Sequence, residues 1–410
     1  MTDKPRLRML EAFPVAQNGQ QLIALRDPAG FTEQVLVLPT ALLDLVSLFD
    51  GEHSVSQIQD ILRGRHGDAP TALQIERLVT SLDDAGFLEG ERFEARRRAI
   101  EEGWARNPLR PAVHAGGAYE SDASALSLQI EGFFRDPDGP GPLADRPAAS
   151  TEPALRGLIA PHIDFHRGGP LYAWAYRELL ARSDADLFVI LGTCHAGMAD
   201  PFAVTLKAYD TPLGAASVDL DFYEDLRRRY GDDLLGSEAA HRNEHSIEFQ
   251  TVMLRHLLGR HRAFSIVPVL ASYLHEAVWS RGDPERDPRV PRFLDALLGA
   301  MAASRRRICV IAGVDLAHVG PRFGDRELNT PQSLEAVATA DLAMLEAVTG
   351  GDATAFYAAV VHDRDRRRIC GLSPIYTFLR ALPGVHGRLL RYRQWPDPEG
   401  AVSFCAAAFP

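Results

Sequence analysis

Short apolar runs alternate with longer amphipathic segments over the C-terminal two-thirds of the chain. Runs such as residues 187–191 and 308–312 are apolar at every position, which is typical of strands buried on both faces. Strands are expected at 155–160, 187–191, 202–207, 264–270 and 308–312, with a terminal strand pair at 389–393 and 401–409. Helices are expected at 171–181, 222–230, 246–258, 290–303, 333–348 and 374–382. This alternation predicts an α/β sandwich with a mixed sheet.

A separate pattern, mostly helical, covers residues 6 to about 95. Residues 35–38 predict a strand, and Thr40, Ser54 and Thr71 are suitable N-caps for three helices. Residues 87–89 predict the start of a closing β-wing, which would complete a winged-helix plan. The pattern resembles the PqqD-like peptide-recognition domains at Leu38-Pro39, Phe49-Asp50-Gly51 and Ala85-Gly86-Phe87-Leu88. A DNA-binding winged helix is the alternative, but Arg77 is the only Arg or Lys between Thr71 and Leu82.

The chain of 410 residues is therefore expected to hold a winged-helix domain at 1–95, a charged linker at 96–109 and the α/β domain at 110–410. Its net charge of -11 disfavours binding to nucleic acid or to an anionic membrane, since both need a cationic face. No apolar run approaches the ~18 residues of a membrane span. The charged N-terminus resembles no export signal, so we expect a cytoplasmic protein with reduced cysteines.

Three residues that can bind a soft or borderline metal follow apolar runs: His162, His195 and Cys370. In open α/β sheets, side chains at the carboxyl ends of neighbouring strands converge on one crevice. Two imidazoles and one thiolate would form a site with an open position for water or substrate, as catalytic metals require. These donors suit iron(II), copper or zinc far better than magnesium or calcium. A helix expected near Pro374 and the cationic run at 364–368 are both expected to lower the pKa of the Cys370 thiol.

Three further residues are candidates for catalysis. Asp315 and His318 end the apolar run at 308–314, and His245 lies at the start of an expected helix. His318 is a candidate general acid or base, because imidazole titrates near neutrality, and Asp315 could orient it or a metal-bound water. The alternative is a structural pair of Asp315 and His318. For the segment around His245, the alternative to a functional role is a helix start whose glutamates are stabilised by the helix dipole.

The larger domain resembles the Memo-like family over about 300 residues. Eight motifs carry the resemblance in order: His114-Ala115-Gly116-Gly117-Ala118-Tyr119, Ala160-Pro161-His162, Gly192-Thr193-Cys194-His195, Thr211-Pro212-Leu213-Gly214, Glu244-His245-Ser246-Ile247-Glu248, Asp315-Leu316-Ala317-His318, Ile369-Cys370-Gly371 and Val402-Ser403-Phe404. The resemblance implies the fold of the class III extradiol dioxygenases, which hold non-haem iron(II).

By the same resemblance, His162, His195 and Cys370 match the family's metal ligands. Asp315 and His318 match residues near the metal, and the segment with His245 lies beside the pocket. Two sequence features depart from the familiar pattern: residues 163–165 read Ile-Asp-Phe, and Cys194 adds a thiol directly before His195.

Two functions follow as expectations. The first is a metal-dependent oxidoreductase or dioxygenase-like enzyme, with iron(II) as the preferred cofactor and copper or zinc as alternatives. Its substrate would be a small molecule or a peptide, and the resemblance points to a radical SAM protein as a pathway partner. The second is a non-catalytic protein that binds a metal, or that acts as an adaptor for a peptide or protein.

Overall fold

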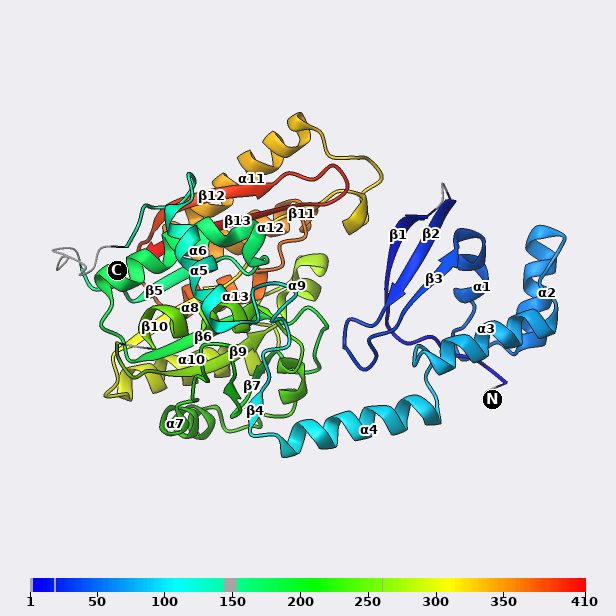
Figure 1. Cartoon of the computed structure of the whole chain (residues 1–410), viewed down its shortest axis with the longest axis horizontal. Helices are drawn as coiled ribbons and strands as arrows, with labels where there is room; N and C mark the ends of the chain where they lie inside the picture. The colour runs from blue at the N-terminus through cyan, green and yellow to red at the C-terminus, as the bar shows by residue number, and fades with distance from the viewer. Residues whose placement is uncertain (1–2, 18–19, 144–152, 260) are drawn as a thin grey trace. The chain divides into compact units, whose positions relative to one another are not determined.

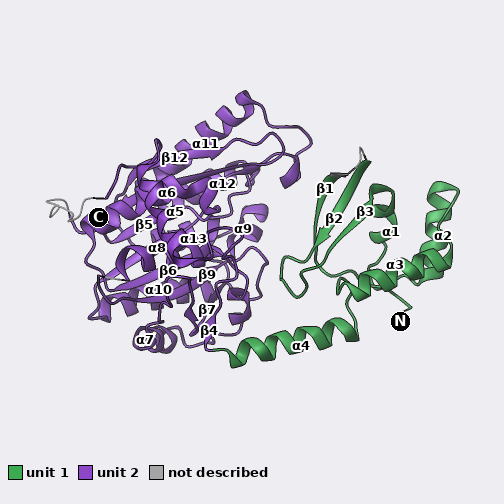
Figure 2. Ribbon diagram, viewed as in Figure 1, with its two compact units in different colours: residues 1–107 green, residues 108–410 purple. Residues whose placement is uncertain are grey.

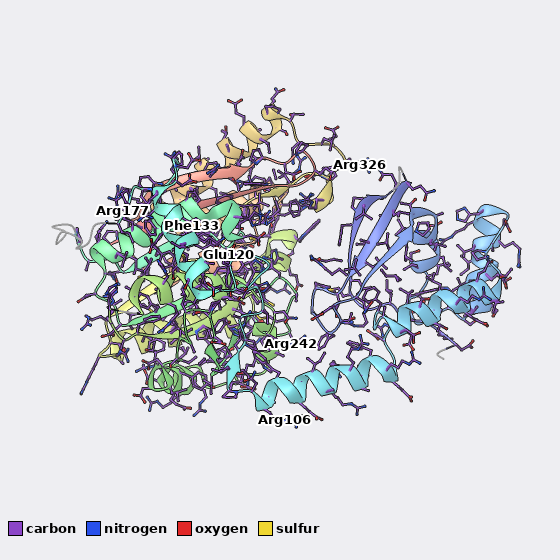
Figure 3. All side chains as sticks on the ribbon, viewed as in Figure 1. Arg106, Glu120, Phe133, Arg177, Arg242 and Arg326 are labelled. Carbon is purple, nitrogen blue, oxygen red and sulfur yellow. The ribbon has the colours of Figure 1, made fainter. Side chains whose placement is uncertain are left out.

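The computed structural model describes the whole chain except residues 1–2, 18–19, 144–152 and 260. It contains two compact units, Met1–Asn107 and Pro108–Pro410 (Figure 2). Each unit has its own apolar core. Charged side chains such as Arg106, Arg177 and Arg326 lie exposed at the periphery (Figure 3). In the described part of the chain, no helix has the length and apolar content that a membrane crossing requires.

Unit 1 combines a small antiparallel sheet with helices. The sheet has the order β1 (Glu11–Gln17), β2 (Gln20–Arg26), β3 (Val35–Pro39). The helical segments that follow are η1 (Thr40–Leu42), α1 (Leu43–Val46), α2 (Val55–His66), α3 (Ala72–Asp84) and α4 (Glu91–Arg106). Ser54 and Thr71 both form capping boxes, so the N-caps expected for α2 and α3 are confirmed.

The expected wing at residues 87–89 is wrong. Leu88 instead forms an isolated bridge with Leu7, and α4 begins at Glu91. The sheet is built from residues before the helices, and the β1–β2 hairpin was not expected. Pro14 weakens the strand signal of β1, because proline donates no hydrogen bond to a neighbouring strand. In the structure β1 is an edge strand, where this loss is tolerated.

Unit 2 is organised around one mixed sheet, as the sequence pattern predicted. Its strand order is β11-β13-β5-β10-β6-β9-β7, with β12 paired to β13. Strands β5, β10, β6 and β9 are parallel, and β7, β11, β12 and β13 pair antiparallel to their neighbours. The bounds are β5 (Gly157–Ala160), β6 (Leu187–Thr193), β7 (Phe202–Val204), β9 (Ser265–Ala271), β10 (Ile308–Gly313), β11 (His318–Val319), β12 (Arg388–Trp395) and β13 (Ala401–Phe409). A second, two-stranded sheet joins β4 (Leu109–Arg110) to β8 (Ala208–Tyr209).

Helices cover both faces of the large sheet (Figure 1). Successive strand residues alternate between two apolar clusters, so Leu158 packs in one cluster and Ile159 in the other. One cluster includes α5 (Ala123–Arg135), α6 (Phe165–Arg182) and α8 (Ser246–Leu258). The other includes α7 (Leu220–Tyr230), α9 (Leu274–Ser280), α10 (Arg289–Ala303), α11 (Pro331–Thr349), α12 (Ala353–His362) and α13 (Leu372–Ala381). Two-sided burial explains why the central strands are apolar at every position.

Helix α6 begins six residues before its expected start at 171, and its first turns contain Gly168, Gly169 and Pro170. These residues usually interrupt a helix, and residues 164–169 were expected to form a loop. A Cβ at Gly169 would lie 2.4 Å from the ring of Phe133, so glycine is needed for close contact with α5. Helices α5, α9 and α12 were not expected from the sequence pattern.

Two glycines at the carboxyl ends of β6 and β10 let α8 approach this edge of the sheet. Gly192 and Gly313 are neighbours in the sheet register. A Cβ at Gly192 would lie 2.5 Å from Ser246 Oγ, and one at Gly313 would lie 2.5 Å from the Ser246 carbonyl oxygen. The first residue of α8 therefore contacts both strand ends, which brings the preceding segment to the same edge.

Replacing Ile311 in the centre of the sheet tests this core. Ile311 is fully buried on β10, between β5 and β6. Ile311→Ala is expected to lower the free energy of unfolding of unit 2 by about 3 kcal/mol, through lost burial and a residual cavity. Leu128→Ala on α5 is the control, because Leu128 is 68% exposed. Denaturant unfolding should show a shift within about 0.5 kcal/mol for Leu128→Ala. Equal effects of the two variants would contradict the assigned core.

Candidate metal centre

His162 follows β5 and is held in one orientation by two hydrogen bonds. Its backbone N–H donates to Asp315 Oδ1 at 3.0 Å, and its Nδ1 donates to the Gly313 carbonyl oxygen at 3.0 Å. Because a carbonyl oxygen can only accept, Nδ1 carries the proton and Nε2 carries the lone pair. Burial lowers the pKa of His162 to about 3, so the imidazole is neutral at pH 7.

His195 follows β6 and is oriented by a buried carboxylate. Its backbone N–H and its Nδ1 both donate to Glu244 Oε2, at 2.9 and 3.0 Å. Burial alone would raise the pKa of Glu244, but His195 and His245 together hold it well below its usual range. Glu244 is therefore ionised and accepts the Nδ1 proton, which leaves the lone pair of His195 on Nε2. A carboxylate–histidine pair of this kind commonly orients a metal ligand.

His245 completes a cluster of three imidazoles at this edge. Ring centroids lie 4.9 Å apart for His162 and His195, and 5.1 Å apart for His162 and His245. His195 and His245 stack at 4.7 Å. One nitrogen from each of the three rings lies within 4.8 Å of the others, a spacing that could hold a metal ion. Burial lowers the pKa of His245 well below its usual value, so its ring is neutral too.

Cys370 contacts this cluster at His162. Its Sγ lies 3.2 Å from His162 Nε2, and its carbonyl oxygen accepts a hydrogen bond from Thr193 Oγ1 at 2.9 Å. The expected lowering of its thiol pKa is wrong. Burial, and then the nearby Asp315 carboxylate, raise the pKa of Cys370 well above its usual value.

The cations that precede Cys370 in sequence are engaged elsewhere. Arg367 pairs with the buried Asp341, and Arg368 donates to Asp325 Oδ1 at 2.6 Å. Because both guanidinium groups are neutralised by these carboxylates, burial dominates at the thiol.

Asp315 and His318 lie beside the cluster. Asp315 Oδ2 is 3.7 Å from His162 Nε2, and burial raises the pKa of Asp315 to about 6. His318 Nδ1 donates to the Leu316 carbonyl oxygen at 3.1 Å, so its lone pair is on Nε2. Burial lowers the pKa of His318, and the Asp315 carboxylate partly opposes this shift. The Phe323 ring packs edge-on against the His318 ring, with the two ring centroids 5.0 Å apart.

The other three cysteines differ from Cys370. Cys194 Sγ donates to the Gly197 carbonyl oxygen at 3.3 Å, and burial raises its pKa to about 12. Cys309 and Cys405 are fully buried within β10 and β13. The sequence pattern did not indicate the role of Glu244, although its position next to His245 in a segment that begins a helix was a usable signal.

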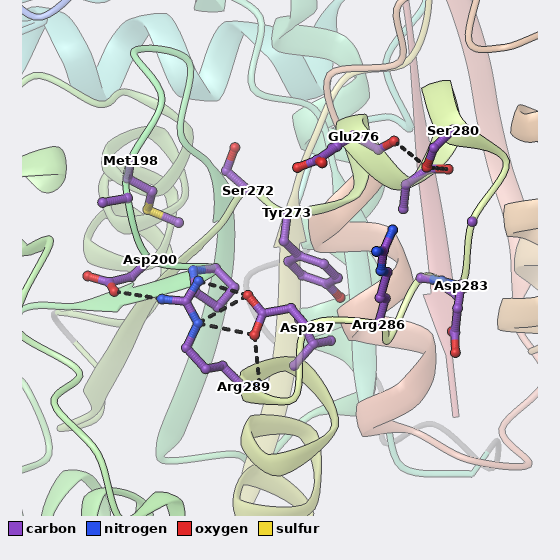
Figure 4. A pocket seen from close by; sticks show the side chains of 16 residues that line it. Met198, Asp200, Ser272, Tyr273, Glu276, Ser280, Asp283, Arg286, Asp287 and Arg289 are labelled. Carbon is purple, nitrogen blue, oxygen red and sulfur yellow. Dashed lines mark hydrogen bonds and ion pairs between the residues drawn. The ribbon is translucent and has the colours of Figure 1, made fainter.

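A cavity of about 420 Å³ lies at the same edge, where residues 198–201 follow β6 and residues 272–273 follow β9 (Figure 4). Thr193 and Ala271, near these strand ends, are partners in the sheet. Arg289, which lines the cavity, is fixed by Asp287 and by Asp200, the latter at 3.2 Å. Tyr273 and Glu276 also line the cavity. The cavity has the size of a small-molecule site.

Fold and site together define an α/β protein with a cluster of histidines and one cysteine at the carboxyl edge of a mixed sheet. The family model for Memo-like proteins matches residues 110–407, so the chain belongs to the Memo-like family. A MEMO1 family protein of Aquifex aeolicus is 26% identical over 99% of this chain and 100% of its own length. Relatives of the same description from Methanopyrus kandleri and Methanothermobacter thermautotrophicus are 31% and 30% identical, over 72% and 71% of this chain and 94% and 95% of their own lengths.

Proposed function

We propose that this protein is a metal-dependent oxidoreductase of the dioxygenase type, acting on a small molecule or a peptide. His162, His195 and Cys370 would bind the metal. The observation that carries the proposal is that His162 contacts both other candidates. Its Nε2 lies 3.2 Å from Cys370 Sγ, and its ring centroid lies 4.9 Å from that of His195. Among the described residues, His162 thus lies next to both other proposed ligands, whereas the three residues whose ligand atoms all lie within 4.8 Å of one another are His162, His195 and His245.

The donor set fits a transition metal. The hydrogen bonds of His162 and His195 direct their protons to Nδ1 and keep Nε2 as the donor atom. Neutral imidazole with thiolate suits iron(II), and copper or zinc would accept the same donors. His245 offers the competing third donor, because its nitrogen also lies within the histidine cluster. Iron(II) is preferred because the fold resembles that of the class III extradiol dioxygenases, which hold non-haem iron(II).

When bound, the metal would supply a centre at which O2 meets an electron-rich substrate such as a phenol or a thiol. In a dioxygenation both atoms of O2 enter the product, so no external reductant is consumed. His318 would accept the proton of the substrate hydroxyl or thiol at Nε2, since its Nδ1 is already held by Leu316. Asp315 would fix His162 through the backbone and keep negative charge beside the accepting imidazole.

A non-catalytic metal-binding or adaptor function is the second candidate. The observation that favours it is the separate unit Met1–Asn107, whose core of fourteen buried residues is distinct from those of unit 2. A unit of this kind could bind a peptide or protein partner. Both candidates require metal, so metal-dependent O2 consumption with candidate phenols, thiols or peptides distinguishes them. No turnover across these substrates, with the metal site fully loaded, would favour the adaptor.

Removing the thiol should weaken metal binding selectively. Cys370→Ser is expected to reduce iron(II) affinity by about 100-fold or more, because losing only an outer-shell partner already costs about 10- to 100-fold. Cys309→Ser and Cys405→Ser are matched controls, since both thiols are buried in strands. Metal content after anaerobic loading measures the difference. Equal retention in all three variants would refute Cys370 as a ligand.

The role of His318 can be separated from metal binding. His318→Ala is expected to retain iron(II) at near wild-type occupancy and to lose turnover by about 100-fold or more, the usual contribution of a general base. Element analysis and O2 uptake on the same preparation provide both values. If the variant loses its metal instead, His318 is a ligand and the proposed proton transfer fails.

Metal affinity should rise with pH. Because burial raises the pKa of the Cys370 thiol, metal-free protein holds that proton at neutral pH, and the metal must displace it. Affinity should increase by up to about tenfold per pH unit between pH 7 and 8.5. Within this range Asp315, with a pKa of about 6, and His162, with a pKa of about 3, are already deprotonated. Calorimetry in buffers of different ionisation enthalpy should detect one released proton, and a flat pH profile would exclude thiolate binding.

A further inference from the structure

We propose that Arg110 is a positioning residue for the candidate metal centre and acts through Glu244 on His195. Arg110 lies in β4 and its side chain is fully buried. Its Nη2 donates to the Glu244 carbonyl oxygen at 2.5 Å, and its Nε donates to the His241 carbonyl oxygen at 3.0 Å. The inference rests on the metal-binding role proposed above, and it assigns a function to a residue 134 positions away in sequence from Glu244.

Most hydrogen bonds of the Arg110 guanidinium go to one segment of chain, residues 241–248, and one more goes from Nη1 to the Pro111 carbonyl oxygen at 2.7 Å. Besides donating to these carbonyl groups, it pairs with the Glu248 carboxylate and lies 5.0 Å from the centre of the Tyr209 ring. Three acceptors between residues 241 and 248, two carbonyl groups and one carboxylate, thus bind one rigid, planar cation. Because a guanidinium directs its N–H groups at fixed angles, it sets the path of this segment as a lysine ammonium cannot.

The second carboxylate oxygen of Glu248 also has hydrogen-bond partners. Its Oε1 accepts the backbone N–H of His114 at 3.1 Å and the hydroxyl of Tyr119. A buried ion pair is costly unless its remaining hydrogen-bonding atoms have partners. The network around Glu248 meets this condition, so Arg110 has a well-defined position from which to hold Glu244.

Glu244 links the position of Arg110 to that of the His195 ring. Its carboxylate accepts three bonds, from the backbone N–H and Nδ1 of His195 and from the backbone N–H of Ser246 at 2.9 Å. A shift of the Glu244 backbone therefore rotates the His195 imidazole or breaks its Nδ1 hydrogen bond. Either change would misdirect the lone pair on Nε2 of His195, the atom proposed to bind the metal.

A purely structural ion pair is the competing explanation, and the chain contains a matched control for it. Arg8 is buried in unit 1, where it donates to both oxygens of Asp27 at 3.1 Å and to the Gly86 carbonyl oxygen at 2.7 Å. It has the same chemistry as Arg110 but belongs to the other unit. Arg8→Lys should reduce stability and leave the metal centre unchanged.

The test uses cobalt(II) added anaerobically to the full-length protein, since its visible spectrum reports ligand geometry. Arg110→Lys is expected to lower cobalt affinity by about 10- to 100-fold and to shift the absorption bands, in line with losses of other outer-shell partners. Glu244→Gln should do the same, and the double variant should be no worse than the more affected single variant. Arg8→Lys should keep both affinity and spectrum. Thermal unfolding of each variant separates lost stability from altered binding.

Distinct results would overturn distinct claims. Arg110→Lys with wild-type affinity and spectrum, or additive effects of Arg110→Lys and Glu244→Gln, would reject the positioning role. If Arg110→Lys does not fold, Tyr119→Phe replaces it, because that change removes one hydrogen bond to Glu248 and keeps the ion pair. An unchanged cobalt spectrum in Tyr119→Phe would then reject the role. Wild-type protein that binds no cobalt at all would instead refute the proposed metal site.

Discussion

The candidate centre depends on how closely the N-terminus of α8 approaches the carboxyl edge of the sheet. Gly192 and Gly313 leave room for Ser246, whose Oγ also donates to the Thr193 carbonyl oxygen at 3.0 Å. With Ser246 fixed there, the two residues before it fall beside the strand ends that carry His162 and His195. Glu244 can then hold His195, and His245 can stack on it. An added side chain at either glycine would push the helix and these two residues away from the site.

The charges of the site are balanced in a way that suits a bound cation. Glu244 is ionised beside His195 and His245, while burial raises the pKa of both Asp315 and Cys370. A divalent ion in the proposed position would offset the cost of removing the Cys370 proton and of keeping Asp315 ionised. The same burial that keeps the thiol protonated without metal would strengthen its attraction to the metal once the proton is displaced. The imidazoles need no such exchange, because burial already keeps His162 and His245 neutral.

The fold could be predicted from sequence where two-sided burial of a strand makes every position in it apolar. All-apolar runs located the central strands, and the strand-end positions of His162 and His195 followed from them. The β1–β2 hairpin and the start of α6 were missed, because Pro14 and the Gly168-Gly169-Pro170 run contradict local rules that tertiary contacts override. The residues that support the site could not be predicted from local sequence patterns, because their partners lie far away in the sequence. Arg110 meets Glu248 across 138 positions, and the cations near Cys370 turn to Asp341 and Asp325.

X-ray absorption at the metal edge of anaerobically loaded full-length protein tests the central claim most directly, which is that His162, His195 and Cys370 bind one metal. The account predicts one sulfur scatterer at about 2.3 Å together with nitrogen scatterers at about 2.0–2.1 Å that show the outer-shell signature of imidazole. A shell of nitrogen and oxygen without sulfur would contradict it, and would assign the third position to His245 rather than to Cys370.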